Sequence, residues 1–218
     1  MVLHRIANGK NLGSSTITSP KDGLRQIMVK IRALRGSQVR FLPAAFFKMP
    51  AKKISIDNAK KEKLFYFVAN VVVYRESDGR CLILRRGEHE KAHPGLWGVL
   101  GGKLEWGDLP IEKPTRINFD ILDYEDALEK LLKKEALEEA GVEIDDKIKY
   151  INSVAFIRAD EIPVILVKFA AKYKGGKIKS ESGNPDDVKW VNSKEVENFK
   201  CIEGIKEEVK KTIEIFSG

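Results

Sequence analysis

A chain of 218 residues with 43% hydrophobic and 33% charged residues has the composition of a folded globular protein, which excludes disorder throughout. No apolar run approaches the roughly 20 residues that span a bilayer, so we expect no transmembrane helix and no membrane partner. The two cysteines, Cys81 and Cys201, lie far apart without metal-binding spacing. They therefore argue against a disulfide scaffold or a zinc site and favour a reducing, cytoplasmic location.

The positive charge lies mainly in the N-terminal region. Residues 1–50 hold nine of the 39 Lys and Arg residues but only one of the 32 acids, Asp22. Residues 51–218 hold 30 basic and 31 acidic residues, a net charge of −1. The formal net charge of +7 therefore reflects the N-terminal region, and we expect any nucleic-acid contact to involve residues 1–50 alone.

Residues 1–50 form a basic extension for which three interpretations stay open. The first is a disordered arm, in keeping with its scattered Gly, Ser, Thr and Asn residues. The second is a misassigned start, because residues 49–53 (MPAKK) resemble an ordinary N-terminus and residues 36–43 can be back-translated into the pattern of a transfer-RNA T-arm. The third is a functional helix, either a targeting peptide or a nucleic-acid arm, because apolar residues recur at helical spacing over 24–34.

The first regular elements are predicted strands. Residues 64–74 (LFYFVANVVVY) are rich in β-branched and aromatic side chains, which favour a strand. A Ser-Asp-Gly turn at 77–79 separates this segment from residues 81–84 (CLIL), so the two are expected to form a hairpin. A short apolar run follows at 96–100, just before a pair of glycines.

The second half of the chain mixes helices and strands. A long helix is expected over 124–140, with apolar residues on one face and Gly141 placed to end it. We expect Ser193 to cap a brief helix. The other expected elements are strands at 148–157, 162–173 and 187–191 and a terminal amphipathic helix at 202–216. This order predicts an α/β layered fold.

Three acidic residues of the long helix form the first candidate site. Glu135, Glu138 and Glu139 stand at i, i+3 and i+4, so their side chains converge on one face. They repel one another at the C-terminal end of the helix, where the dipole also disfavours negative charge, unless a cation binds there. Mg²⁺ is hard and prefers oxygen ligands, so it suits carboxylates. The alternative interpretation is a solvated acidic face balanced by neighbouring lysines.

A glycine-rich segment at 97–108 (WGVLGGKLEWGD) supplies a second candidate. Gly101 and Gly102 allow the backbone to bend tightly and to approach a ligand closely. Lys103 can hold a phosphate as a point charge. Taken alone, Gly-Gly-Lys is a weak signal and more often marks an ordinary turn.

Together the two motifs resemble the Nudix hydrolase family, whose box runs G-x5-E-x7-R-E-U-x-E-E-x-G-U, with U an apolar residue. Gly102 opens the box, and residues 134–142 (KEALEEAGV) match its second half at every position except the Arg, which is Lys134 here. The similarity covers residues 63–217. It implies a Nudix-type α/β/α sandwich with a mixed sheet over 51–218, preceded by an N-terminal extension expected to be disordered.

The sequence departs from the box in three ways. About 18 additional residues, near 109–124, separate Gly102 from the helix. The first box glutamate therefore corresponds to Asp108 when counted forward and to Asp126 when counted back. Lys134 cannot reproduce the planar fork of the arginine that it replaces, although a point charge remains.

The resemblance implies a Mg²⁺-dependent hydrolase that cleaves the pyrophosphate linkage of a nucleoside diphosphate linked to X, with Mn²⁺ as a substitute ion. Residues 97–103 are similar to the MutT-like branch, which acts on nucleoside triphosphates, although Leu100 stands where that branch usually has Pro. One alternative is an ADP-ribose or nucleotide-sugar pyrophosphatase. Another is a non-catalytic Nudix-fold module for nucleotide binding or regulation.

The resemblance also assigns roles residue by residue. Glu138 and Glu139 are the main metal ligands, with the carbonyl of Gly102 nearby. Glu135 is a further ligand or the base for the attacking water, and Lys134 orients Glu135. The candidate substrate-binding residues are Arg85, Arg86, Lys103 and Trp97.

Several smaller assignments stay open. The two arginines also fit a solvated strand end, and Trp97 and Phe65 either stack on a base or pack in the core. His89 and His93 are expected at the surface. A nucleotide is the expected small-molecule partner, and a homodimer remains open. A further metal carboxylate is sought among Asp160, Glu161, Glu181, Asp186 and Asp187.

Overall fold

The computed structural model describes residues 50–57, 59–179 and 187–218. Apart from Pro50, the predicted basic extension lies outside these residues, so its three interpretations stay predictions. No helix in the described ranges combines the length and apolarity needed to cross a membrane.

Strand β1 (Tyr66–Arg75) lies at the centre of the sheet. Its residues Val71, Val72 and Val73 are buried on both faces, as suits a central strand. It pairs in parallel with β9 (Pro163–Gly176) and in antiparallel with β2 (Arg80–Arg85). In this register Tyr74 lies opposite Cys81, so the predicted first hairpin is confirmed.

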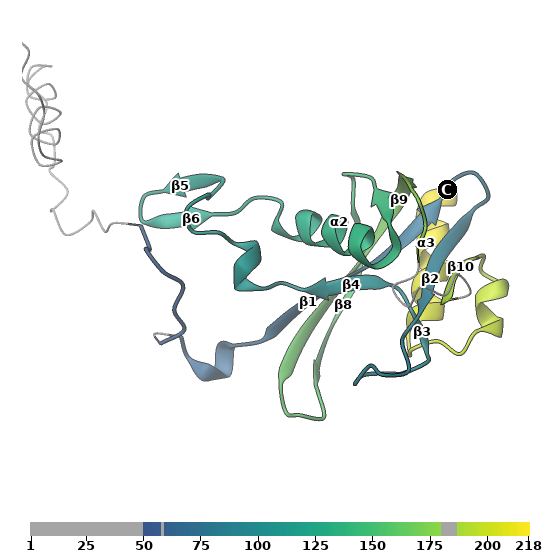
Figure 1. Ribbon diagram of the computed structural model, residues 1–218, viewed down its shortest axis with the longest axis horizontal. Helices are drawn as coiled ribbons and strands as arrows, with labels where there is room; N and C mark the ends of the chain where they lie inside the picture. The colour runs from purple at the N-terminus through teal and green to yellow at the C-terminus, as the bar shows by residue number, and fades with distance from the viewer. Residues whose placement is uncertain (1–49, 58, 180–186) are drawn as a thin grey trace, which may run out of the picture. The chain divides into compact units, whose positions relative to one another are not determined.

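The described residues form one mixed sheet of eight strands, with β10-β2-β1-β9-β7 as its main order (Figure 1). Strand β10 is Val188–Val191, and β7 is Val142–Ile144. Three strands lie off this path: β3 (Trp97–Gly98) pairs with β2, β4 (Leu100–Lys103) with β1, and β8 (Lys149–Ile157) with β9. The predicted apolar run at 96–100 thus divides between β3 and β4.

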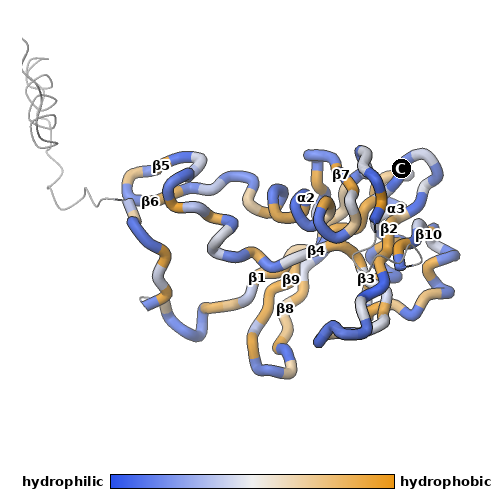
Figure 2. The backbone as a smooth tube through the Cα atoms, in the orientation of Figure 1, coloured by the Kyte–Doolittle hydropathy of each residue, from blue (hydrophilic) through white to orange (hydrophobic). Residues whose placement is uncertain are grey.

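One helix covers each face of the sheet. Helix α2 (Ala127–Ala140) packs Leu131 and Leu132 against one face, while α3 (Ile205–Ser217) packs Ile205 and Val209 against the other. The two core layers use alternate residues of β1: Val71 and Val73 face α2, and Val72 faces α3. Figure 2 shows that β8 and β9 are mainly hydrophobic, with a polar turn between them. The architecture is the α/β/α sandwich expected from the resemblance.

Both long helices begin three residues later than the sequence pattern predicts. Asp126 has a φ of +56° and Gly204 a φ of +86°, and neither left-handed conformation can continue an α-helix backward. The end of α2 is as predicted: Gly141 has a φ of +66°, and its N–H donates to the carbonyls of Ala136 and Leu137.

The prediction that Ser193 caps the brief helix is wrong. That 3₁₀ helix, η5, runs over Glu195–Asn198. The Asn192 side chain accepts hydrogen bonds at 2.9 Å from the backbone N–H groups of Lys194 and Glu195. An asparagine carbonyl two or three residues upstream therefore satisfies these donors.

The insertion between the two halves of the box contains a small hairpin of its own. Strands β5 (Arg116–Asn118) and β6 (Ile121–Asp123) pair in antiparallel, and Arg116 donates to the Asp123 carboxylate at 2.9 Å. Phe119 occupies the turn with a φ of +57°. This hairpin was not predicted, because its turn lacks the Asn-Gly or Asp-Gly pair that marks such turns.

An ion pair is buried between the sheet and α3. Lys168 of β9 contacts Glu208 of α3, and the two side chains are only 11% and 2% exposed. Burial raises the pKa of the Glu208 carboxyl, whereas the hydrogen bond from Lys168 lowers it. Each charge is therefore stabilised mainly by the other, because both side chains are largely shielded from water.

Candidate functional site

The two halves of the candidate site meet where α2 crosses β4. The Glu139 carboxylate accepts a hydrogen bond of 3.2 Å from the Gly101 N–H. The Glu135 carboxylate lies directly against Gly102, so closely that a Cβ on that glycine would overlap it. The structure therefore brings Glu135, Glu139 and the glycine pair together despite the insertion between them.

The two glycines leave room for different neighbours. A Cβ on Gly101 would overlap the backbone carbonyl of Ala69 and the side-chain oxygen of Asn70, both on β1. A Cβ on Gly102 would overlap only the Glu135 side chain among its nearest neighbours. Gly101 thus permits the pairing of β4 with β1, and Gly102 permits the close approach of a carboxylate.

We predict that Gly102→Ala and Gly101→Ala have separable effects. Gly102→Ala should displace Glu135 and reduce turnover at least tenfold, while unfolding stability falls by less than about 1 kcal/mol because a side chain can rotate away. Gly101→Ala should lower the free energy of unfolding by about 1–3 kcal/mol, because a strand must shift. Urea denaturation and turnover assays on both variants check this, and equal stability losses would contradict it.

The electrostatics of Glu135 favour a neighbouring cation. Partial burial raises the pKa of the Glu135 carboxyl; the nearby Lys134 lowers it, and the negative charges of Glu138, Asp108 and Glu105 raise it. A bound cation would relieve both the repulsion and the loss of solvation.

Lys134 contacts Asp108 rather than Asp126. Its ammonium nitrogen lies 3.4 Å from an Asp108 oxygen, and this hydrogen bond raises the pKa of Lys134. Asp108 ends the short 3₁₀ helix η3 (Trp106–Asp108), whereas Asp126 precedes the first turn of α2, about two helical turns before Lys134. Of the two alignments of the first box acid, the structure therefore places the forward one, Asp108, beside the box.

The candidate ligands are all oxygen atoms, which suits a hard divalent ion, but the carboxylates do not converge on one point. In the described ranges, no three Asp, Glu, His or Cys side chains lie close enough together to hold a metal ion. Glu138 is exposed, so its carboxylate can rotate toward Glu135 and Glu139 at little cost. All the candidate donors are oxygens, and the glycine at position 102 leaves space for a carboxylate at the strand.

Arg85 and Arg86 are held by the loop that follows β2. Arg85 donates to Glu88 at 2.6 Å and lies 3.7 Å from Asp187. Arg86 donates to the Ala92 carbonyl at 2.9 Å and forms an ion pair with Glu90. A phosphate would have to compete with these acids, and the role of both arginines stays a prediction.

Trp97 lies on the face of the sheet opposite the glutamates. Its ring packs edge-to-face on Phe199 with centroids 4.9 Å apart, within the core layer beneath α3. Lys103, in contrast, is exposed at the end of β4, one residue beyond Gly102. Phe65 is 46% exposed, whereas Trp97 is partly buried. His89 and His93 are exposed in the β2–β3 loop.

The candidates for a further metal carboxylate are scattered. Asp160 and Glu161 lie in the β8–β9 turn, where Asp160 accepts from Arg158 at 2.8 Å. Asp187 lies beside Arg85, as described above. Glu181 and Asp186 fall outside the described residues.

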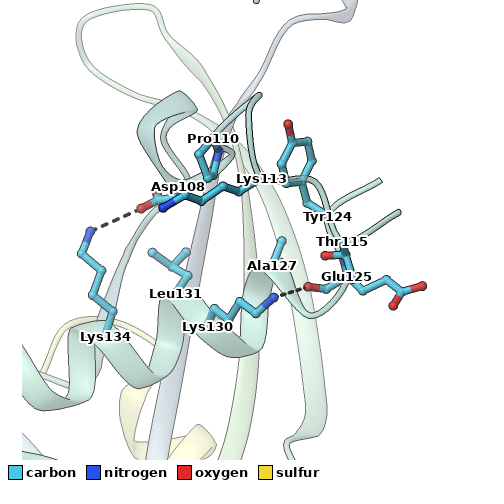
Figure 3. A pocket seen from close by; sticks show the side chains of 10 residues that line it. All are labelled: Asp108, Pro110, Lys113, Thr115, Tyr124, Glu125, Ala127, Lys130, Leu131 and Lys134. Atoms are coloured by element: carbon cyan, nitrogen blue, oxygen red, sulfur yellow. Dashed lines mark hydrogen bonds and ion pairs between the residues drawn. The ribbon is translucent and has the colours of Figure 1, made fainter. Parts of the chain in front are cut away.

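A pocket that the sequence did not predict adjoins the candidate site. It has a volume of about 230 Å³ and lies between the insertion and α2 (Figure 3). Its walls all come from residues 108–134, where the insertion folds back onto α2, and no sequence motif marks such a pocket. Its lining residues include Asp108, Lys113, Tyr124, Lys130, Leu131 and Lys134.

Comparison with known proteins identifies the fold. No family model matches the chain, and no curated protein sequence matches it. The Nudix domain of NrtR from Shewanella oneidensis, solved with ADP ribose, is 17% identical with a TM-score of 0.51, over 72% of this chain and 94% of that one. A MutT protein from Methanosarcina mazei is 18% identical with a TM-score of 0.49, over 73% of this chain and all of that one. The first likeness shows that the chain has the Nudix fold.

Proposed function

We propose that the chain is a Mg²⁺-dependent pyrophosphohydrolase acting on a nucleoside diphosphate linked to X, with a nucleoside triphosphate as the preferred substrate. One observation carries the proposal: Glu135 and Glu139 of α2 lie against Gly101 and Gly102 of β4. This contact supports the proposal, because it brings the two separated halves of the motif together. An acidic surface without a role would have no need of Gly102, which leaves room for the Glu135 carboxylate.

Each residue has a part in the proposed reaction. Glu138, Glu139, Glu135 and the Gly102 carbonyl would hold Mg²⁺, or Mn²⁺ in its place. The ion would lower the pKa of the attacking water and neutralise charge that develops on phosphorus. Glu135 suits the role of proton acceptor, because its carboxylate lies against Gly102 beside the group that would hold the ion. Lys134, held by Asp108, adds positive charge beside these carboxylates.

Two alternatives rest on specific observations. The ADP ribose bound by the Shewanella oneidensis NrtR domain supports ADP-ribose or a nucleotide sugar as substrate. A non-catalytic nucleotide-binding module is supported by Lys134 in place of Arg and by the lack of three convergent metal-binding side chains in the described ranges.

A substrate panel tests the proposal. Nucleoside triphosphates, ADP-ribose, nucleotide sugars and dinucleoside polyphosphates are incubated with the full chain and Mg²⁺, and the products are separated. We expect a nucleoside triphosphate and water to give the monophosphate and pyrophosphate, and EDTA to abolish the reaction. Binding without turnover of any compound, in Mg²⁺ or Mn²⁺, would instead support the non-catalytic module.

A further inference from the structure

The pocket between the insertion and α2 connects with the proposed metal site along one side of the helix. Lys130, Lys134 and Glu138 are spaced four residues apart, so they form a row with about 6 Å between successive members. The first two line the pocket, and the third belongs to the carboxylate group. A ligand in the pocket could therefore extend along this row to the metal site.

The residues that line the pocket carry a net charge of +1, from three lysines and two acids. Asp108 pairs with Lys134, and Glu125, 3.3 Å from Arg116, shares that arginine with Asp123. Lys130 donates to the neutral backbone carbonyl of Glu125 at 2.8 Å. Lys113 donates its backbone N–H to the Pro110 carbonyl at 3.0 Å, while its ammonium group makes no hydrogen bond or ion pair within the described ranges. The ammonium groups of Lys113 and Lys130 thus remain for an anion.

The two sides of the pocket differ in origin. Lys113 comes from the insertion, whereas Lys130 and Lys134 come from α2 (Figure 3). The apolar side chain of Leu131 lies between them, and Tyr124 lines one side of the pocket. Each ammonium group is a flexible point charge with three donors, so the two together can hold one phosphate of a longer ligand.

We propose that this pocket binds a phosphate that lies beyond the scissile diphosphate, through Lys113 and Lys130. The inference rests on the proposed hydrolytic function and narrows its substrate class. A nucleoside triphosphate or a dinucleoside polyphosphate has such a phosphate, while ADP-ribose and simple nucleotide sugars have none. The insertion thereby acts as a specificity element for polyphosphate chains.

The test compares substrates and variants of the full chain. In the double variant Lys113→Gln/Lys130→Gln, KM for a nucleoside triphosphate should rise about tenfold or more, with a smaller change in kcat, since two charge-assisted contacts are lost. KM for ADP-ribose should change less than about threefold. Lys133→Gln is the matched control, because Lys133 lies on the same helix and pairs with Asp146 outside the pocket.

A binding measurement separates this inference from the hydrolytic proposal. Calorimetry with inorganic tripolyphosphate, in EDTA, should show weaker binding to the double variant than to the wild type or to Lys133→Gln. Equal binding in all three, or an equal rise of KM for both substrates, would overturn the pocket assignment even if the enzyme is active. Lysine-dependent binding in a chain that hydrolyses nothing would leave the pocket in place and refute the hydrolase.

Discussion

Replacing Glu138 or Glu139 with glutamine is expected to lower kcat about 10³-fold with any substrate that the wild type hydrolyses. Each change removes one negative charge from the group that would hold Mg²⁺ while keeping the shape of the side chain. Glutamine at position 139 can still accept the hydrogen bond from Gly101, so the fold should be retained. Initial rates across a range of Mg²⁺ concentrations measure the effect.

The matched control is Glu129→Gln, which makes the same chemical change near the start of the same helix. Its kcat should stay within about twofold of the wild type, because Glu129 stands more than two turns before Glu138. If Glu138→Gln and Glu139→Gln both turn over at the rate of this control, the proposed metal site is wrong.

Glu208→Ala is expected to lower the free energy of unfolding by about 3–5 kcal/mol, because it leaves the Lys168 ammonium buried without a counter-charge. The partner change Lys168→Ala should have a similar effect for the same reason, since Glu208 is only 2% exposed. Urea denaturation followed by circular dichroism measures both. The double variant Lys168→Ala/Glu208→Ala should lose much less than the sum of the two single losses.

A hydrophobic replacement of the pair distinguishes charge from packing. Lys168→Met/Glu208→Leu keeps most of the volume and removes both charges, so its stability should lie within about 1–2 kcal/mol of the wild type or exceed it. Lys172→Met is the control, because Lys172 lies on the same strand and pairs with the exposed Glu76. A loss below about 1 kcal/mol in Glu208→Ala would show that water reaches the pair.

The fold was largely predictable from the sequence because its central elements are marked by strong local patterns. The valines of β1 and the apolar face of α2 can be buried in only a few ways, and Gly141 marks the helix end. The helix starts were less accurate, since Asp126 at the start of α2 is not a residue type that reliably marks a left-handed conformation. The hairpin of the insertion lacks any strong turn signal.

The candidate site was predictable only in part. The spacing of the three glutamates places them on one face, and the family resemblance brings Gly102 to them. No local pattern decides between Asp108 and Asp126, because the answer depends on how the insertion folds back onto α2. The pocket likewise depends on how the insertion folds onto α2, and the Lys168–Glu208 pair joins two distant segments. The acids that engage Arg85 and Arg86 are evident only from the folded loop.

The insertion also changes how the site is assembled during folding. The contact between Gly102 and Glu135 closes a loop of 33 residues, about 18 more than an uninterrupted box would have. Loop-closure entropy grows only with the logarithm of length, so the longer connection destabilises this contact by about 0.7 kcal/mol. Such a small entropic penalty leaves evolution, and protein engineering, free to vary the length and sequence of this connection. Its hairpin could be exchanged for other segments while the carboxylates and glycines beneath it continue to meet.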